Sequence, residues 1–287
     1  MNKTSIEWTH RPQTPGMGLT WNPIRARRKS DGKVGWACTH ASTGCLHCYA
    51  ESINKRFGTG LPFNVPSLSD VEFFLDEKIL QEPLKLKKPA TIFVGDMFDL
   101  FHEAMPNALI VRVLTVAMLV QCEKHVFQFL TKRAERMYRL LGSITAPPVN
   151  WWLGVSVENQ KYADERIPWL LQTPAVIRFL SVEPMLEAIS PPMVGMRSRA
   201  FRAELSWVIC GGESGAGARE FNLAWADALR ADCTAFGVPF FMKQVGSNPY
   251  VVRQGVKVPM TGMCKISRKG GDPTIWPESL RVREFPA

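Results

Sequence analysis

The sequence lacks the long apolar run that a membrane-spanning helix requires. Such a helix needs about 20 consecutive apolar residues, and no stretch of the chain contains them. The first residues, MNKTSIEWTHRPQ, also lack the apolar core of a secretory signal peptide. Both absences predict a cytoplasmic protein that has no membrane partner.

Low-complexity tracts and clear linkers are missing as well. A chain of 287 residues that is 46% hydrophobic is long enough for one large core, and α/β barrels often reach this size as one domain. We therefore expect a single domain over residues 1–287. Residues 247–287 are rich in Pro, Gly, Lys and Arg and are expected to form a C-terminal extension, either a tail or a lid, and residues 191–204 an exposed loop.

Short apolar runs recur along the chain, separated by polar or Gly-rich turns and by helical stretches. Runs with so little polar alternation are typical of strands buried on both faces of a parallel sheet. The runs are residues 91–96, 126–132, 151–158, 176–183, 207–213 and 239–246, and the helical stretches are 104–122, 161–172 and 222–236. With one further strand leading into the cysteine region, this alternation predicts an α/β fold, a parallel (β/α) barrel that is full or partial and TIM-like.

Ionisable residues stand at or near the carboxyl ends of the predicted strands. They are Asp96, Lys132, Glu158, Glu183, Glu213 and Lys243. Any one of them is explained by a strand that reaches solvent, but α/β barrels build their active sites at this end. The whole set therefore favours a functional rim.

Positive charge is in excess, since the net charge is +9. Such an excess favours a polyanionic partner, and nucleic acid is the commonest one. Two clusters carry much of it: Arg25, Arg27, Arg28, Lys29 and Lys33 in one, and Arg197, Arg199 and Arg202 in the other. Charge alone does not distinguish a nucleic-acid surface from a solvated loop, so both interpretations stay open.

Cysteine is scarce, yet three of the seven cysteines lie close together. In a reducing compartment they are thiols or metal ligands rather than disulfides. Cys38, Cys45 and Cys48 have the spacing C-x6-C-x2-C, which places three thiolates on one loop within residues 20–50, the cluster loop. The others, expected to be small buried apolar residues, are Cys122, Cys210, Cys233 and Cys264.

Two kinds of metal site can use these three thiolates. One is a structural zinc site completed by His40, His47 or a distant cysteine. The other is a four-iron, four-sulfur (4Fe–4S) cluster with three cysteine ligands and one open iron. A closed zinc site usually draws on two close ligand pairs, and the chain has no second Cys-x2-Cys. The cluster is therefore favoured, with the zinc site as the alternative.

Several motifs give the chain a likeness to a known family. Trp21-Asn22-Pro23 and the segment from Ser42 to Glu51 resemble the phage protein Gp37/Gp68 family, also called DUF5131. The resemblance continues in order through Asp99-Leu100-Phe101-His102, Leu130-Thr131-Lys132-Arg133, the segment from Leu153 to Asn159, Leu180-Ser181-Val182-Glu183-Pro184, the segment from Gly211 to Gly215, and Lys243-Gln244. It covers most of the chain, and it implies fold and site more directly than activity.

That family is similar in turn to radical S-adenosylmethionine enzymes. These have a partial or full α/β barrel and a three-cysteine 4Fe–4S cluster after the first strand, with the usual spacing C-x3-C-x2-C. Cys45 and Cys48 match this spacing, whereas Cys38 stands three residues farther upstream, beyond an insertion that holds the basic run Arg25 to Lys33. The similarity implies a cluster on these cysteines, S-adenosylmethionine as cofactor, an electron donor such as flavodoxin or ferredoxin, and a 5′-deoxyadenosyl radical that abstracts a hydrogen atom from substrate.

The resemblance also implies cofactor-binding residues at the strand ends: Gly95, Asp96, Ser156, Glu158, Gly211, Gly212 and Glu213. Gly95 and Asp96 are expected to accept a hydrogen bond from the methionine ammonium. Ser156 and Glu158 are expected to hold the ribose hydroxyls. The two adjacent glycines allow close backbone approach to the adenine or methionyl end.

The catalytic candidates are Lys132, Glu183 and Lys243. Lys132, Arg133 and Lys243 are expected to face a substrate phosphate or the cofactor carboxylate. The alternative is that they form structural ion pairs with the rim carboxylates.

The expected substrate is a nucleic-acid base, with phage DNA favoured. The basic charge and three tryptophans expected to be exposed, Trp8, Trp21 and Trp36, support it. A base in a duplex must be extruded before a buried radical can reach it, and base modification is preferred over repair. The alternatives are a zinc-stabilised nucleic-acid-binding protein without catalysis, and a radical enzyme that acts on a small molecule.

Overall fold

The computed structural model describes residues 1–12, 18–192, 204–260, 262 and 268–286. It contains two compact units, which are Met1–Leu153 with Pro174–Val176 (unit 1) and Gly154–Thr173 with Ile177–Ala287 (unit 2). Most of the predicted loop 191–204, with its cluster Arg197, Arg199 and Arg202, lies outside the described residues, and so does Cys264.

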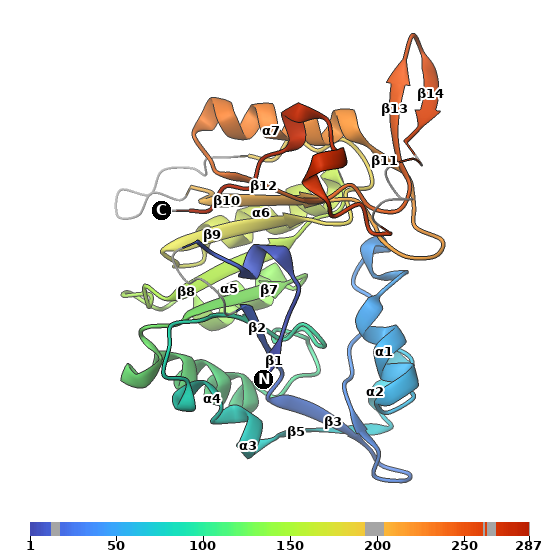
Figure 1. Cartoon of the computed structure of the whole chain (residues 1–287). Coiled ribbons are helices and arrows are strands. Elements are labelled where there is room, and N and C mark those ends of the chain that lie inside the picture. Colours follow the sequence, from blue (N-terminus) through green and yellow to red (C-terminus); the bar gives the residue numbers. More distant parts are fainter. Residues whose placement is uncertain (13–17, 193–203, 261, 263–267, 287) are drawn as a thin grey trace. The chain divides into compact units, whose positions relative to one another are not determined.

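The main sheet is built from the apolar runs. Its strands are β1 Asn2–Lys3, β2 Gly18–Trp21, β6 Thr91–Val94, β7 Val126–Thr131, β8 Trp151–Ser156, β9 Ile177–Val182, β10 Trp207–Gly211 and β12 Phe240–Gln244. These eight strands have the order β1-β2-β6-β7-β8-β9-β10-β12 (Figure 1). The described pairs β2–β6, β6–β7, β9–β10 and β10–β12 are parallel, and only the short β1 pairs antiparallel, with β2. An α/β fold with a mostly parallel sheet is therefore confirmed, and its closure into a barrel stays a prediction.

The strands are buried as the sequence predicts. Every residue of β6, β8 and β10 is buried, as expected where both faces of a sheet are covered. In unit 2, a Cβ atom added to Gly154 of β8 would lie 2.4 Å from the ring of Phe179, too close for any side chain. Only glycine allows β8 and β9 to pack this closely.

Helices follow the strands. Unit 1 holds α1 Tyr49–Phe57, α2 Val65–Leu68, α3 Glu77–Leu80, α4 Asn107–Met118 and α5 Ala134–Leu141, and unit 2 holds α6 Gln160–Gln172 and α7 Leu223–Phe236. Short 3-10 helices are η1 Glu7–Thr9, η2 Thr43–Cys45, η3 Pro83–Lys85, η4 Val120–Cys122, η5 Pro273–Ile275 and η6 Glu278–Leu280. The caps are local: Asn159 accepts from the Tyr162 N–H at the start of α6 at 3.0 Å, and α7 ends at Gly237 with φ +66°. The three predicted helical stretches correspond to α4, α6 and α7.

Two small sheets complete the units. In unit 1, β3 Ile24–Arg28 lies between β4 Val34–Gly35 and β5 Val71–Leu75 and pairs antiparallel with both. In unit 2, β13 Pro249–Arg253 pairs with β11 Phe221–Asn222 and β14 Val256–Pro259. The basic run of the predicted insertion is therefore part of a sheet.

The predicted C-terminal extension packs on its own unit over its described residues. Trp276 is buried and donates from its indole N–H to the Gly270 carbonyl at 2.9 Å. Arg283 donates to the carbonyls of Met242 and Lys243 in β12 at 3.1 and 2.9 Å. These contacts fix the end of the chain against β12.

In the part of the chain that the structure describes, no helix combines the length and the apolar character that crossing a membrane would take.

Candidate metal centre

The three clustered cysteines lie on the connection from β4 to α1 in unit 1. Cys45 closes η2, where its N–H donates to the Ser42 carbonyl at 3.0 Å. The Cys48 N–H donates to the Cys45 carbonyl at 3.2 Å, and the Cys48 carbonyl accepts from the Ser52 N–H at the start of α1. Cys45 and Cys48 are therefore one turn apart, and their backbone is fixed by the entry into the helix.

All three are free thiols and half-buried. Burial raises the pKa of Cys38 to about 12, and the nearby Cys45 and Cys48 raise it as well, whereas Arg133 lowers it. Burial also raises the pKa of Cys48, and Lys132 is close enough to lower it. The three sulfurs thus lie within electrostatic range of one another, with two cations beside them.

A buried ion pair holds the Cys38 end of the loop. Arg133 contacts Asp99 at 3.2 Å, and the Arg133 guanidinium donates to the carbonyl and hydroxyl of Thr39 at 2.8 and 3.0 Å. Burial opposes the charge on Asp99, but Arg133, Thr131 and two backbone N–H groups together hold its pKa below the usual value. The pair is therefore ionised, and its spare donors fix the backbone next to Cys38.

His102 adds a second contact to Thr39. Its Nε2 lies 2.8 Å from the Thr39 hydroxyl, and its Nδ1 accepts from the Ala104 N–H at 3.0 Å. Because Nδ1 accepts, the ring proton is on Nε2 and donates to Thr39. Burial lowers the pKa of His102 to about 4, so the ring is neutral near pH 7.

Glu51 of α1 fixes the other part of the loop. It lies 2.7 Å from His40 and 2.7 Å from Lys55, and it accepts from the Phe63 N–H at 3.2 Å. Burial opposes its charge, but Lys55, His40 and Phe63 together lower its pKa. His40, a predicted zinc ligand, is therefore engaged with a carboxylate.

The residue Asp96 and its neighbour Gly95 follow β6 and lie beside the start of α1. The Tyr49 hydroxyl donates to the Asp96 carbonyl at 2.5 Å. The Asn22 amide joins the ends of β2 and β6, since it donates to the Asp96 carboxylate at 2.6 Å and accepts from the Met97 N–H at 3.2 Å. Burial raises the pKa of Asp96 despite these hydrogen bonds. The structure thus brings Gly95, Asp96 and Lys132 together with the cysteine loop.

The donor set, three free thiols on one loop, has the chemistry of a three-cysteine cluster, and it also allows a zinc site. Among the described residues, no three His, Cys, Asp or Glu side chains are arranged to hold one metal ion. The remaining predicted zinc ligand, His47, is exposed.

The predicted residues of unit 2 form ion pairs and close backbone contacts. The pairs are Glu158–Arg166 at 3.0 Å, Glu183–Lys243 at 2.7 Å and Glu213–Arg219 at 2.6 Å. Ser156 is buried, and its carbonyl accepts from Arg166 at 2.8 Å. Gly211 lies where a Cβ would be 3.4 Å from the Glu183 carboxylate. The end of β10 and the turn after it therefore lie close to Glu183 and Lys243 within the unit. These strand-end residues are Gly211, Gly212 and Glu213.

Sequence reasoning missed the partners of these residues. Asn22, Thr39, His102, Arg166 and Arg219 were not singled out, although Asn22 and His102 stand in the family motifs.

The expectation that Trp8 and Trp21 are exposed is wrong, because both are buried in the core of unit 1. Trp36 is half-buried. The prediction of small buried cysteines is confirmed for Cys122, Cys210 and Cys233.

Comparison with known proteins gives one match. A family model described as "Protein of unknown function (DUF5131)" matches residues 3–263. No curated protein and no solved structure matches the chain.

Proposed function

Since the chain belongs to the DUF5131 family, we propose that it is a radical S-adenosylmethionine enzyme whose 4Fe–4S cluster is held by Cys38, Cys45 and Cys48. The observation that carries the proposal is the cysteine loop. It presents three free thiols within electrostatic range of one another. Hydrogen bonds fix both ends of the loop, at Thr39 and at Glu51, and this supports the proposal because fixed ligands favour metal binding.

The residues around the loop suit a charged cofactor. When bound, such a cluster would supply the electron that cleaves S-adenosylmethionine to a 5′-deoxyadenosyl radical. Asp96 is half-buried, and its backbone carbonyl accepts from the hydroxyl of Tyr49, the residue after Cys48. Its carboxylate, which accepts from Asn22, is proposed to accept also from the methionine ammonium. Lys132 lies near Cys48 and is a suitable partner for an anionic group.

The proposed contacts in unit 2 are those of the predicted residues. Ser156 and Glu158 are proposed to serve the ribose, and Gly211, Gly212 and Glu213 the adenine or methionyl end. Glu183 and Lys243, proposed as catalytic residues, neutralise each other in the described arrangement. Lys132 has no such pair among the described residues, so it is the stronger catalytic candidate.

The proposed substrate is a base of nucleic acid, DNA in the first place. The net charge of +9 supports a polyanionic substrate. A flavodoxin or ferredoxin is the proposed electron donor, as the similarity to radical enzymes implies.

Metal analysis tests the proposal directly. Wild-type protein, reconstituted anaerobically, is expected to hold about four iron and four sulfide per chain. Cys45→Ala is expected to lose most of them. Cys122→Ala is the matched control, because Cys122 is a buried thiol of the same unit outside the loop, and it is expected to keep the wild-type content. Iron that is retained in Cys45→Ala, or one zinc per wild-type chain, contradicts the proposal.

A further inference from the structure

The small sheet β3–β5 has one covered face and one open face. The pairs Ile24–Leu75, Ala26–Phe73 and Arg28–Val71 lie on one face, and Arg25–Phe74 and Arg27–Glu72 on the other. Ala26 and Val71 are buried, and they form an apolar cluster with Ala37, Leu61, Leu68 and Phe73. The face that holds Arg25 and Arg27 is the more open one, since Arg27 and Glu72 are exposed and Arg25 and Phe74 are half-buried.

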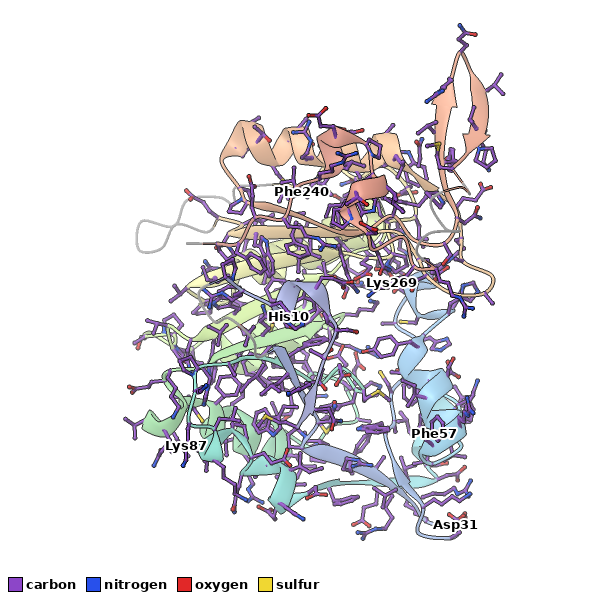
Figure 2. All side chains as sticks on the ribbon, in the orientation of Figure 1. His10, Asp31, Phe57, Lys87, Phe240 and Lys269 are labelled. Carbon is purple, nitrogen blue, oxygen red and sulfur yellow. The ribbon has the colours of Figure 1, made fainter. Side chains whose placement is uncertain are left out.

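Helix α1 closes the covered face from the β4 side. A Cβ on Gly35 would lie 2.3 Å from the Thr59 backbone and 2.5 Å from the Asn54 side chain. No side chain fits there, so the sheet and the end of α1 pack backbone to backbone. Figure 2 labels Asp31 at the tip of the β3–β4 hairpin and Phe57 near the end of α1.

The open face, here called the arginine face, carries two cation–aromatic stacks. The Arg25 guanidinium lies 4.5 Å from the centre of the Trp36 ring, and the Arg27 guanidinium lies 4.5 Å from the centre of the Phe74 ring. Stacked guanidinium planes and aromatic rings are the surfaces on which single-stranded nucleic acids stack their bases. Arg27 and Phe74 belong to adjacent cross-strand pairs of β3 and β5, and Trp36 directly follows β4.

The charge around the arginine face is mostly positive. Arg28 is neutralised by Asp31, and Lys29 donates to the Ser69 carbonyl at 2.8 Å. Arg27 and Lys33 are exposed and have no ion pair among the described residues. Two acidic residues oppose this charge: Glu72 lies opposite Arg27, and Asp76 is close enough to Arg25 to raise its pKa against the lowering by burial. A strand of phosphates is therefore attracted to the arginine face.

We infer that the arginine face binds a single-stranded segment of nucleic acid, with bases stacked on Arg25–Trp36 and Arg27–Phe74 and phosphates near Arg27 and Lys33. The inference rests on the proposed function only for its choice of nucleic acid as substrate. It deepens that proposal, because it says which surface of the protein binds the substrate and that the bound segment is single-stranded.

The chain links the arginine face to the cysteine loop. Trp36 follows β4 directly and precedes Cys38 by two residues, a span of at most about 7 Å. The Trp36 backbone N–H donates to the Asn54 side chain at 2.9 Å, which fixes the backbone at the start of this span. A base stacked there stands beside the loop that carries the proposed cluster.

Fluorescence anisotropy of the reconstituted full chain tests the inference. The probe is a labelled oligothymidine of about 20 nucleotides, longer than a single stacking groove needs. Arg27→Glu is expected to weaken binding about tenfold and to reduce the salt slope by about one. Lys87→Glu is the matched control, because it makes the same charge change at an exposed lysine outside the small sheet, and it is expected to change binding less than about twofold.

Two further arms make the result decisive. An abasic oligonucleotide of the same length is expected to bind at least about fivefold more weakly, because it keeps the phosphates and lacks the stacking bases. Lys33→Glu, at an exposed hairpin residue, repeats the charge test if Arg27→Glu does not fold. Wild-type affinity in the folded charge variants, or equal affinity for the abasic strand, overturns the inference. Iron content separates the two proposals. A charge variant that loses DNA binding but keeps wild-type iron supports the arginine face and leaves the cluster unaffected. Wild-type protein that binds DNA but holds no iron contradicts the cluster and leaves the arginine face unaffected.

Discussion

Units 1 and 2 use their buried ion pairs differently. In unit 2 each predicted rim carboxylate has its own cation: Glu158–Arg166, Glu183–Lys243 and Glu213–Arg219. In unit 1 Arg133 pairs with buried Asp99 and with exposed Glu103, and its guanidinium also donates to Thr39. The first kind of pair stabilises its own elements, and the second also fixes a loop.

The difference shows what a charged residue at a strand end does. Such a residue is close to a site in many α/β folds, but its position alone does not separate catalysis from structure. The hydrogen bonds that the cation makes outside its pair add information: Arg166 donates to the Ser156 carbonyl of β8, and Arg133 donates to Thr39 in the cysteine loop. Arginine has five donors in a rigid fork, so a pair with a carboxylate leaves some of them available. In unit 1 they reach the residue next to Cys38.

The largest expected effect compares the two arginines directly. Arg133→Met and Arg166→Met each leave a carboxylate buried without its cation, Asp99 in one case and Glu158 in the other. Each is expected to lower the free energy of unfolding by about 3–5 kcal/mol, measured by urea unfolding. Only Arg133→Met is expected to lose iron as well, because only Arg133 fixes the cysteine loop.

Each variant is the control for the other, since both are similarly destabilised. Arg133→Lys sharpens the comparison further, because a lysine keeps the charge but cannot reach Asp99 and both oxygens of Thr39 with one planar fork. We expect it to regain stability and to recover iron only in part. Equal iron loss in Arg133→Met and Arg166→Met would mean that the cluster simply follows stability.

The sequence predicted the main elements well and their partners poorly. The apolar runs became β6, β7, β8, β9, β10 and β12, because strands buried on both faces need little beyond apolar side chains. The β3–β5 sheet was not predicted. The segment IRARR carries charge at alternate positions, and its pairing with β5 joins residues more than forty apart in the chain. A basic segment therefore looked like a loop.

The candidate site was predicted only at the residues whose chemistry is distinctive. Three cysteines on one loop are conspicuous in any sequence. Asp99 lies in a turn after β6, and Thr39 contributes a backbone carbonyl, so neither has a signature in spacing or composition. Arg166 stands in the interior of α6 and looks like a solvated helix residue, although it is buried against Glu158. These contacts depend on tertiary structure.

Lowering the pH is expected to destabilise unit 1 through its histidines. All five histidines precede residue 126, in unit 1. Burial lowers the pKa of His125 from 6.5 to about 4, so the unfolded chain binds this proton first. The stability that neutral His125 contributes is complete above about pH 6.5 and is lost as the pH falls toward 4.

For His125 the loss between about pH 7 and pH 5 is expected to be about 2 kcal/mol. Urea unfolding at the two pH values measures it, and His125→Leu is expected to remove that part of the pH dependence. His10→Leu, at an exposed histidine of the same unit, is the matched control. An unchanged pH dependence in His125→Leu would show that the pKa of this ring does not differ between the folded and the unfolded chain.

The smallest expected effect concerns the Glu183–Lys243 pair of unit 2, and it tests whether this pair only stabilises its own strands. Glu183 and Lys243 are each 17% exposed, so water screens part of their attraction. A double-mutant cycle of Glu183→Gln and Lys243→Met is expected to give a coupling energy of about 1 kcal/mol. If the pair is only structural, Lys243→Met keeps the wild-type rate of S-adenosylmethionine cleavage in reconstituted protein. Loss of cleavage at unchanged iron content and stability would instead make Lys243 a catalytic residue. The Glu183–Lys243 pair would then contribute to the reaction as well as to stability, whereas Asp99–Arg133 fixes the cysteine loop.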